Sequence, residues 1–263
     1  MAFKSPKEIV QTAITAGCAK ASLSTEKMLV MGFLAGAYIA LGGLLAIIVG
    51  RAVNTETLGA GVGKLLFGGV FPVGLMLVII AGAELFTGNT AVIPPGCLVG
   101  KAKWTGLLKN WGLVYVGNFI GSLFVAYFLG KATGLVATDP WLTATKSIAE
   151  GKVALEWGAA FWRGVGCNWL VCLAVWLALG SDDIGGKILA IWFPIMAFVA
   201  MGMEHSIANM FFIPLGMFQG ANVTIGQFLW NNLVPVTLGN IVGGSLLVGG
   251  IYYWVYGREE KKA

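Results

Sequence analysis

The stretch Gly82-Ala-Glu-Leu-Phe-Thr-Gly-Asn89 recurs 120 residues later as Gly202-Met-Glu-His-Ser-Ile-Ala-Asn209. Both copies read Gly-x-Glu-x4-Asn, and both lie inside long apolar runs. The run around the first copy, residues 65–100, contains 36 residues and a single charge, Glu84. It is too long for one membrane helix of about 20 residues and too short for two complete helices with a turn. We therefore predict two half-helices that meet at a break inside the membrane.

A second pattern indicates that the whole chain is internally duplicated. Asn110-x6-Gly117-Asn118-x2-Gly121 recurs 122 residues later as Asn232-x6-Gly239-Asn240-x2-Gly243. Each copy contains three predicted spans, an odd number, so the two halves enter the membrane in opposite senses. The prediction is an aquaporin-like inverted 3+3 repeat whose second and fifth helices are broken. The glycines of the second pattern are expected to let helix backbones approach closely.

The composition places the chain in a membrane. Hydrophobic residues make up 57% and charged residues 11%, against about 25% charged in an average soluble domain, and the mean hydropathy is +0.82. Between Lys187 and Arg258 the only formal charge is Glu204. A soluble protein could not cover its surface with so few charges, so we predict an all-α polytopic membrane protein surrounded by lipid. The net charge of +5 comes from chain ends and short loops, which argues against a nucleic-acid partner.

The apolar runs predict six membrane-spanning segments, at residues 28–50, 65–100, 110–130, 164–181, 188–217 and 232–256. Breaks are expected near 83–92 and 204–208. Pro94 and Pro95 follow the first break and predict a shortened or kinked half-helix there.

The expected organisation follows from these spans and from the Lys and Arg distribution. It comprises a cytosolic N-terminal amphipathic helix (1–27), a first three-helix repeat (28–135), an outer loop (136–160), a second three-helix repeat (161–257) and a cytosolic tail (258–263). With the N-terminus inside, the inner segments hold 11 of the 17 basic residues. This bias predicts a multi-pass protein of the cell membrane with both termini in the cytosol.

Three ionisable side chains lie deep in the apolar segments: Glu84, Glu204 and His205, the only histidine. A charge at a helix centre costs roughly 2.5–3.5 kcal/mol on insertion scales, so each needs internal partners or water. We interpret the glutamates, with Asn89 and Asn209, as structural groups that accept N–H bonds at the breaks; direct contact with a solute is the alternative. His205 differs, because its repeat equivalent is Leu85 and the duplication does not require a histidine. Its titration range suits a hydrogen-bond donor or proton carrier in a pore.

Four stretches resemble the formate–nitrite transporter family. They are Gly82-Ala-Glu-Leu-Phe-Thr87, Lys109-Asn-Trp-x5-Gly117-Asn118, Glu204-His-Ser-Ile-Ala-Asn-Met-Phe-x-Ile-Pro214 and Asn231-Asn-Leu-Val-Pro-Val-Thr-x-Gly239-Asn240. The resemblance covers residues 5 to 257 and implies a homopentamer in which each aquaporin-like protomer has its own pore for small monovalent anions.

The same resemblance implies roles for individual residues. It implies a central pair, His205 and Thr87, a basic vestibule residue, Lys152, and a polar wall residue, Asn168. It also implies hydrophobic constrictions on either side of the histidine, formed by Phe71, Leu75, Leu85, Phe86 and Phe198.

The function expected from residues and resemblance together is passage of formate. Lys152 and the outer basic residues would concentrate the anion, and apolar constrictions would exclude hydrated ions. A weak-acid anion could take up a proton near the centre, with His205 as relay or positive field, and cross as the neutral acid. Neither a cofactor nor a metal site is expected, and no catalytic constellation indicates an enzyme.

Three alternatives remain at this stage. Nitrite and hydrosulfide are also conjugate bases of weak acids and fit the same pore. An aquaporin-type pore for neutral solutes should carry Asn-Pro-Ala at both breaks, where this chain has Asn89-Thr-Ala and Asn209-Met-Phe. A membrane anchor of a redox complex would need paired histidines to bind haem, and this chain has one.

Overall fold

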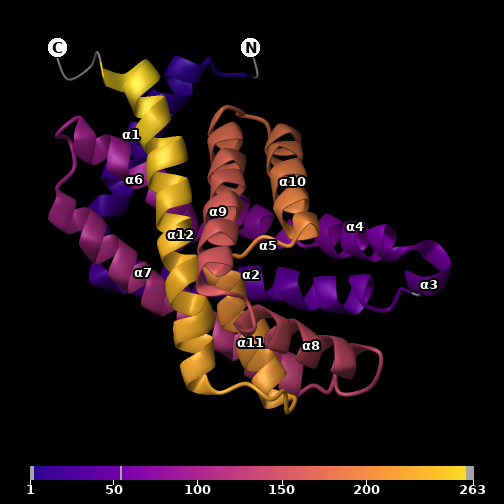
Figure 1. Cartoon of the computed structure of the whole chain (residues 1–263). Helices are drawn as coiled ribbons and strands as arrows, with labels where there is room; N and C mark the ends of the chain where they lie inside the picture. The colour runs from indigo at the N-terminus through magenta and orange to yellow at the C-terminus, as the bar shows by residue number, and fades with distance from the viewer. Residues whose placement is uncertain (1–2, 54, 259–263) are drawn as a thin grey trace.

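The computed structural model describes residues 3–53 and 55–258, and these residues form a bundle of helices joined by loops (Figure 1). The first half contains α1 (Pro6–Ala21), α2 (Thr25–Gly50), α3 (Thr55–Leu58), α4 (Ala60–Val70), α5 (Val73–Met76), the π-helical η1 (Leu77–Gly82), α6 (Phe86–Leu98), α7 (Trp104–Phe124) and the π-helical η2 (Val125–Lys131). The second half contains α8 (Trp141–Val153), α9 (Trp157–Leu179), α10 (Ile184–Met201), α11 (Ser206–Phe218), η3 (Gln227–Leu233), α12 (Val234–Gly244), η4 (Ser245–Gly250) and η5 (Tyr253–Gly257).

Six of the described helical segments are long and apolar enough to cross a membrane, which confirms the predicted number of spans. They are Thr25–Gly50, Gly61–Gly82, Trp104–Lys131, Trp157–Leu179, Ile184–Met201 and Gln227–Gly257. The protein is therefore an all-helical, multi-pass membrane protein. The second and fifth spans are each followed by a short helix, α6 and α11, and each of these has 13 residues.

The two helix breaks occur where the repeated motif predicts them, but they are shorter than expected. The chain leaves the helix at Gly82 and Gly202, whose φ angles of 91° and 75° lie in the left-handed region that glycine tolerates. It becomes helical again at Phe86 and at Ser206. The expected extents of 83–92 and 204–208 were wrong, because side chains from neighbouring helices cap α6 and α11 directly after the glutamates.

Pro94 and Pro95 lie inside α6 without shortening it, contrary to the expectation from sequence. Pro94 has a repeat equivalent, Pro214, inside α11, and the two helices have the same length. A proline cannot donate to the carbonyl four residues before it, which leaves the Thr90 carbonyl without its helical donor. The Ser245 hydroxyl donates to that carbonyl at 2.8 Å. This bond from η4 replaces the one that the proline removes.

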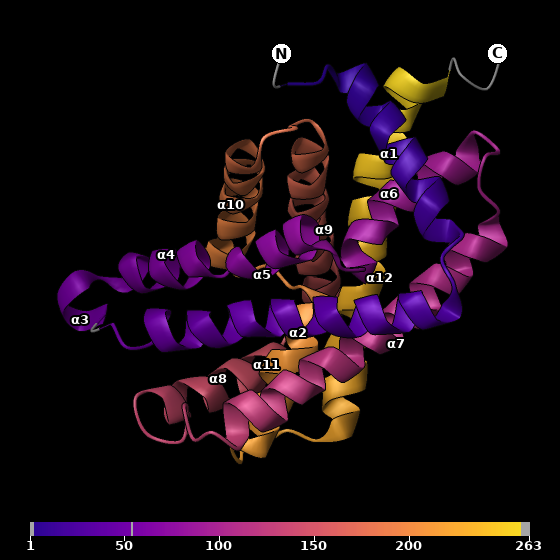
Figure 2. The ribbon, with the colours of Figure 1, turned by 180° about the vertical axis from the view of Figure 1, so that it is seen from behind.

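The two halves use glycines in the same way to pack their long helices. In the first half α2 lies against α7, and in the second α9 lies against α12 (Figures 1 and 2). A Cβ atom at Gly121 of α7 would collide with the Phe33 carbonyl of α2, and one at Gly243 of α12 would collide with the Val165 carbonyl of α9. The small residues therefore permit backbone contact, as their spacing predicts.

Helices α1 and α8 extend the internal symmetry beyond the predicted three-helix repeats. The segment predicted as an outer loop, 136–160, contains helix α8, which packs against α11 as α1 packs against α6. The number of residues from the end of α1 to the end of α8 equals the number from the beginning of α2 to the beginning of α9. Figure 2 shows α1 with α6 at one end of the molecule and α8 with α11 at the other. Each half is therefore a long helix pair, a broken segment and a short helix beside the break.

Candidate functional site

The first break is held by a buried cluster around Glu84. Its carboxylate is 2.6 Å from the Lys20 ammonium of α1 and accepts a 2.8 Å bond from the Asn89 side-chain amide. Asn89 also donates to Asn110 Oδ1 at 2.9 Å, and Asn110 donates to the Lys20 carbonyl at 3.0 Å. The glutamate is only 4% exposed. Buried carboxylates require such compensation, so the cluster joins α1, the break and α7 into one unit.

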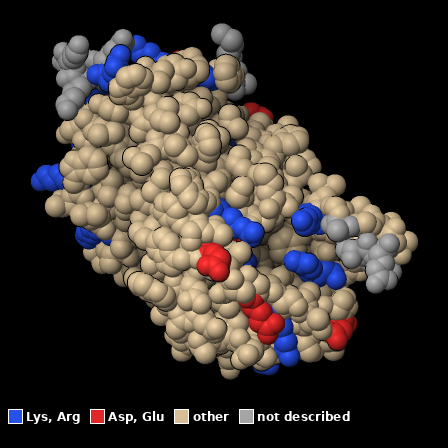
Figure 3. Space-filling model, in the orientation of Figure 1, with Lys and Arg blue, Asp and Glu red and all other residues tan. Residues whose placement is uncertain are grey.

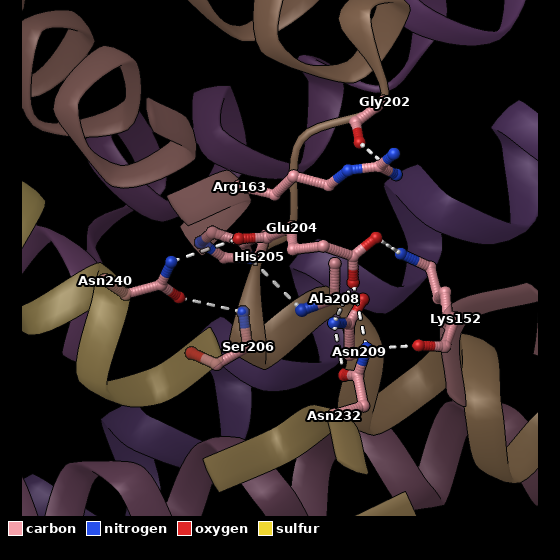
Figure 4. A network of polar contacts seen from close by, with 10 residues as sticks. All are labelled: Lys152, Arg163, Gly202, Glu204, His205, Ser206, Ala208, Asn209, Asn232 and Asn240. Carbon is pink, nitrogen blue, oxygen red and sulfur yellow. Dashed lines mark hydrogen bonds and ion pairs between the residues drawn. The ribbon is translucent and has the colours of Figure 1, made fainter. Parts of the chain in front are cut away.

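The second break carries the same cluster with equivalent residues (Figure 4). Glu204 is 2.8 Å from the Lys152 ammonium of α8 and accepts bonds from Asn209 at 2.6 Å and Asn232 at 3.1 Å. Asn209 donates to Asn232 Oδ1 at 2.7 Å, and Asn232 donates to the Lys152 carbonyl at 3.0 Å. Glu204 is 3% exposed. A structural interpretation of the glutamates agrees with this geometry, but their partners are lysines and asparagines rather than freed backbone N–H groups.

One further asparagine connects each break to the long helix pair of its half. Asn118 donates to the Gly32 and Glu84 carbonyls at 2.7 and 2.9 Å, and its oxygen accepts the Phe86 N–H at 3.0 Å. Asn240 makes the equivalent contacts with Gly164, Glu204 and Ser206 at 2.8, 3.0 and 2.9 Å. Each asparagine thereby satisfies the first N–H of the short helix. Only the glycines of this pattern were assigned a role from the sequence; the structure shows that Asn118 and Asn240 cap α6 and α11.

The structure places His205 and Thr87 in direct contact at the centre. Thr87 Oγ1 is 2.9 Å from His205 Nε2, and both residues are buried. The other ring nitrogen, Nδ1, accepts the Ala208 backbone N–H at 3.1 Å and so caps α11. A backbone N–H can only donate, so Nδ1 carries no proton and the neutral ring holds its proton on Nε2. His205 therefore donates to Thr87, which leaves the Thr87 hydroxyl hydrogen free to donate elsewhere.

The Thr87 backbone is fixed by side chains from its own helix, α6, and from α9. Its carbonyl accepts bonds from Thr90 Oγ1 at 2.6 Å, Asn168 Nδ2 at 3.2 Å and Cys172 Sγ at 3.3 Å. Asn168 also donates to the Asn240 carbonyl at 2.6 Å. Asn168 was expected to form a polar wall of the pore, but its amide is directed at backbone carbonyls and it lines neither cavity described below. Asn168 therefore links Thr87 to Asn240, the residue that caps α11.

Two cavities, one beside each helix break, lie next to the central pair. We call the larger one, of about 920 Å³, the large vestibule; His205, Lys152, Phe71 and Phe198 line it. In the view of Figure 3 it lies between α4 and α8, where Lys and Arg side chains surround a hollow. We call the cavity of about 250 Å³ the small vestibule, lined by Lys20, Glu84, Leu75, Leu85 and further aliphatic side chains. The predicted constrictions are thus aromatic on one side of the centre and aliphatic on the other.

Phe86, which the resemblance placed at a constriction, packs against α7. It lines neither vestibule and packs edge-to-face against Tyr115 and Trp111 of α7, with ring centroids 4.9 and 6.0 Å away. Its two neighbours in the chain are Leu85, which lines the small vestibule, and Thr87, which contacts His205. The first turn of α6 directs successive side chains to different sides, so only tertiary packing decides which of the three points at the pore.

Sequence reasoning missed Lys20, Asn110 and Asn232 as members of the break clusters. Lys20 and Lys152 occupy corresponding positions in the last turns of α1 and α8. A search for the repeat outside the apolar spans would have found this correspondence. The two asparagines were visible in the second repeated pattern, where each begins the motif.

The comparisons with known proteins agree with this architecture. A family model described as formate/nitrite transporter matches residues 7–254. A relative from Methanothermobacter thermautotrophicus, described as a probable formate transporter, is 54% identical and is matched over 98% of each chain. A solved structure described as an FNT family ion channel has a TM-score of 0.86 at 33% identity, over 94% of this chain and 98% of its own. Another, described as a pentameric formate channel with formate bound, has a TM-score of 0.77 at 33% identity, over 88% and 97%.

Proposed function

The chain belongs to the formate/nitrite transporter family, and from that premise we propose that it conducts formate across a membrane, with a separate pore in each protomer of a homopentamer. Family membership makes it a membrane transport protein rather than an enzyme. Formate is supported by the description of the relative with 54% identity. The pentamer and the bound formate are described for a structure that shares the fold over 88% of this chain.

The observation that carries this proposal is the contact between Thr87 and His205 between the two vestibules. His205 lines the large vestibule, while Leu85 and Gly88, on either side of the Thr87 turn, line the small one. A solute that passes from one vestibule to the other must therefore separate or skirt the 2.9 Å contact. Two side chains that both donate hydrogen bonds suit the two oxygens of a carboxylate or carboxylic acid.

Proton uptake accompanies the passage of formate in this mechanism. Removing formate from water disfavours its charged form, so its affinity for a proton rises as it enters the apolar constriction. We propose that the proton comes from solvent in the vestibule and that neutral formic acid crosses the centre. Chloride has no neutral acid accessible near neutral pH and cannot avoid the desolvation penalty in this way.

His205 serves as a neutral hydrogen-bond donor in this mechanism, not as the relay expected from sequence. A second proton would have to bind Nδ1, which already accepts the Ala208 N–H. Protonation of Nδ1 would direct its N–H at the Ala208 N–H, so the two donors would repel and the cap of α11 would be lost. We propose that Nε2–H and the Thr87 hydroxyl hold the solute, and that the ring keeps its tautomer throughout.

The membrane orientation is also a proposal. Helix α1 packs against η5, so the beginning and the end of the described chain lie at the same end of the molecule. The basic residues are more frequent in segments on that side, which favours the cytosol for both termini. The small vestibule, which α1 covers with Ala16 and Lys20, would then face the cytosol of the cell, and the large vestibule would face outward.

Flux into liposomes with a pH indicator inside tests the proposal. Purified protein should raise formate uptake above that of protein-free vesicles, and the lumen should acidify in proportion to the formate taken up. Parallel assays with nitrite, hydrosulfide and glycerol separate the alternatives. Faster uptake of nitrite or hydrosulfide than of formate would show that the faster anion, and not formate, is the main substrate. Formate uptake without acidification of the lumen would contradict proton uptake.

A further inference from the structure

We infer that Arg51 and Lys64 form an anion-collecting site at the mouth of the large vestibule, and that these two residues, rather than Lys152, give the vestibule its positive field. The inference rests on the proposed function, since it concerns how a small anion reaches the centre. It differs from the role that resemblance assigns to Lys152.

The charges that line the large vestibule do not act independently. Its described lining contains three cations, Arg51, Lys64 and Lys152, and two carboxylates, Asp139 and Glu204. The Lys152 ammonium lies 2.8 Å from the Glu204 carboxylate. At distances much larger than this separation the two charges cancel, so the pair contributes little to the field at the mouth. The remaining positive charge belongs to Arg51 and Lys64.

Arg51 contacts the Phe67 ring, and Lys64 lies one helical turn before Phe67 on α4. The Arg51 guanidinium is 5.3 Å from the ring centroid of Phe67, a cation–π contact. Lys64 precedes Phe67 by three residues on α4, so the two side chains share a face of that helix. Among the described carboxylates none forms an ion pair with either cation. A guanidinium on a ring face keeps its N–H edge available, and that edge matches a carboxylate.

A row of aromatic rings connects this site to the centre. Phe67 stacks on Phe212 with centroids 5.9 Å apart, and Phe212 stacks on Phe71 at 6.3 Å. Phe71 contacts Phe198 at 6.0 Å, and Phe198 lies 6.0 Å from the His205 ring. Ring edges carry partial positive charge and tolerate an anion better than aliphatic groups do. All four phenylalanines line the large vestibule, so an anion collected at Arg51 and Lys64 is in the same cavity as His205.

The small vestibule lacks an equivalent site within the part of the chain that the structure describes. Its only charged lining residues there are Lys20 and Glu84, which pair at 2.6 Å. The rest of its lining is aliphatic or polar and uncharged. The two break clusters are related by the internal repeat, whereas Arg51 and Lys64 have no counterpart in this described lining. The positive field therefore belongs to one side of the pore.

Asp139 is a negatively charged residue of the same vestibule, so its removal should change the electrostatic potential in the opposite direction from removal of Arg51 or Lys64. It lines the large vestibule and accepts bonds from the Thr143 hydroxyl at 2.6 Å and the Thr143 N–H at 3.0 Å. These bonds hold the pKa of Asp139 below its usual value, so the carboxylate stays charged near neutral pH. Its negative charge opposes the field of Arg51 and Lys64. Removing it should strengthen the attraction for anions.

The field can be measured without any transport. Ser147 of α8 lines the large vestibule and is exposed, so Ser147→Cys introduces a thiol there in the full-length assembly. The ratio of its reaction rates with an anionic and a cationic methanethiosulfonate reports the local potential. Arg51→Gln and Lys64→Gln should each lower this ratio about two- to fourfold at low ionic strength, as for a unit charge roughly 8 Å away in partly screened water. Asp139→Asn should raise it, and a high salt concentration should reduce all differences.

Two controls make the result decisive. The parent protein without Ser147→Cys gives the background of Cys18, Cys97, Cys167 and Cys172. Lys131→Gln removes an exposed charge that lines neither vestibule and should leave the ratio unchanged. Unchanged ratios in both Arg51→Gln and Lys64→Gln would overturn the inference. Because the labelling requires no flux, this failure is distinguishable from failure of formate transport.

Formate kinetics provide a second readout. The double substitution Arg51→Gln with Lys64→Gln should raise the KM for formate entering from the large vestibule at least threefold, with little change in kcat, because the centre is intact. An equal loss in kcat would show that the residues act on the centre or on folding, and it would contradict a collecting role.

Discussion

Lys20 and Lys152 occupy equivalent positions in the two inverted halves: each lies in the last turn of a short helix and pairs with the buried glutamate of its own helix break, at 2.6 and 2.8 Å. In both halves the backbone carbonyl of the same lysine accepts an asparagine side chain at 3.0 Å. The duplication therefore preserved a lysine–glutamate–asparagine cluster at each vestibule. Such a cluster belongs to the architecture of each half rather than to one entrance of the pore.

Removing the carboxylate charge from either cluster should destabilise the assembled protein. Glu204→Gln keeps the side-chain size but leaves Lys152 with an uncompensated charge that is mostly buried. We expect a loss of about 2–3 kcal/mol, below the range for a fully buried pair because Lys152 retains some solvent contact. Thermal unfolding in mild detergent measures it. Adding Lys152→Met to Glu204→Gln should recover part of the lost stability. If the loss in the double variant equals the sum of the losses in the two single variants, the two side chains do not interact and the pairing is contradicted.

The bond from Ser245 to the Thr90 carbonyl should matter only because Pro94 cannot donate. Ser245→Ala leaves that buried carbonyl without a partner and should cost about 1–3 kcal/mol. Pro94→Ala restores the helical N–H, so Ser245→Ala should cost much less in that background. A double-mutant cycle on thermal stability measures the coupling. Equal costs in both backgrounds would show that the hydroxyl does not replace the missing helical donor.

Close helix packing predicts opposite effects for two glycines on the same helix. A Cβ at Gly121 would meet the Phe33 carbonyl of α2, whereas a Cβ at Gly112 would meet nothing within 4 Å. Gly121→Ala should therefore destabilise the protein by about 1–3 kcal/mol through overpacking. Gly112→Ala should be neutral or slightly stabilising, because alanine favours a helix. Similar melting temperatures for both variants would contradict the backbone contact between α2 and α7.

His205→Asn separates the neutral-donor mechanism from a proton relay. Asparagine is a good N-cap and should keep the first turn of α11, but it is too short to cap Ala208 and also reach Thr87. Formate flux should fall at least about tenfold, the effect of losing one hydrogen bond to the passing solute. The rise of flux with decreasing pH should keep its shape, because the proton binds the anion from solvent. Thr87→Val is a matched control that should also lower flux without changing that shape.

The measurement is formate uptake into liposomes between about pH 5 and 8, the interval around an unperturbed imidazole pKa. A flat pH profile for His205→Asn, with a normal profile for Thr87→Val, would show that the imidazole carries the proton. That result would contradict the neutral tautomer inferred from the Ala208 contact.

The sequence by itself determined the class of protein, the number of spans and the place of the breaks. These properties depend on local quantities: the length of apolar runs, which lipid requires, and a motif that occurs twice in equivalent runs. The special position of His205 was also visible, because comparison with Leu85 needs only the repeat. The resemblance in the motif stretches was sufficient to identify the family before any geometry was known.

Only the tertiary structure decided which side chains meet. Lys20 and Glu84 are distant along the chain, and no periodicity relates an amphipathic helix to a break in another span. The direction of Phe86, the contacts of Asn168 and the donor that replaces Pro94 depend on how α6 is rotated against α7, α9 and η4. The pairing of Lys152 with Glu204, and hence the assignment of the vestibule field to Arg51 and Lys64, likewise required distances. A sequence lists charges, but their separation in space determines whether they cancel.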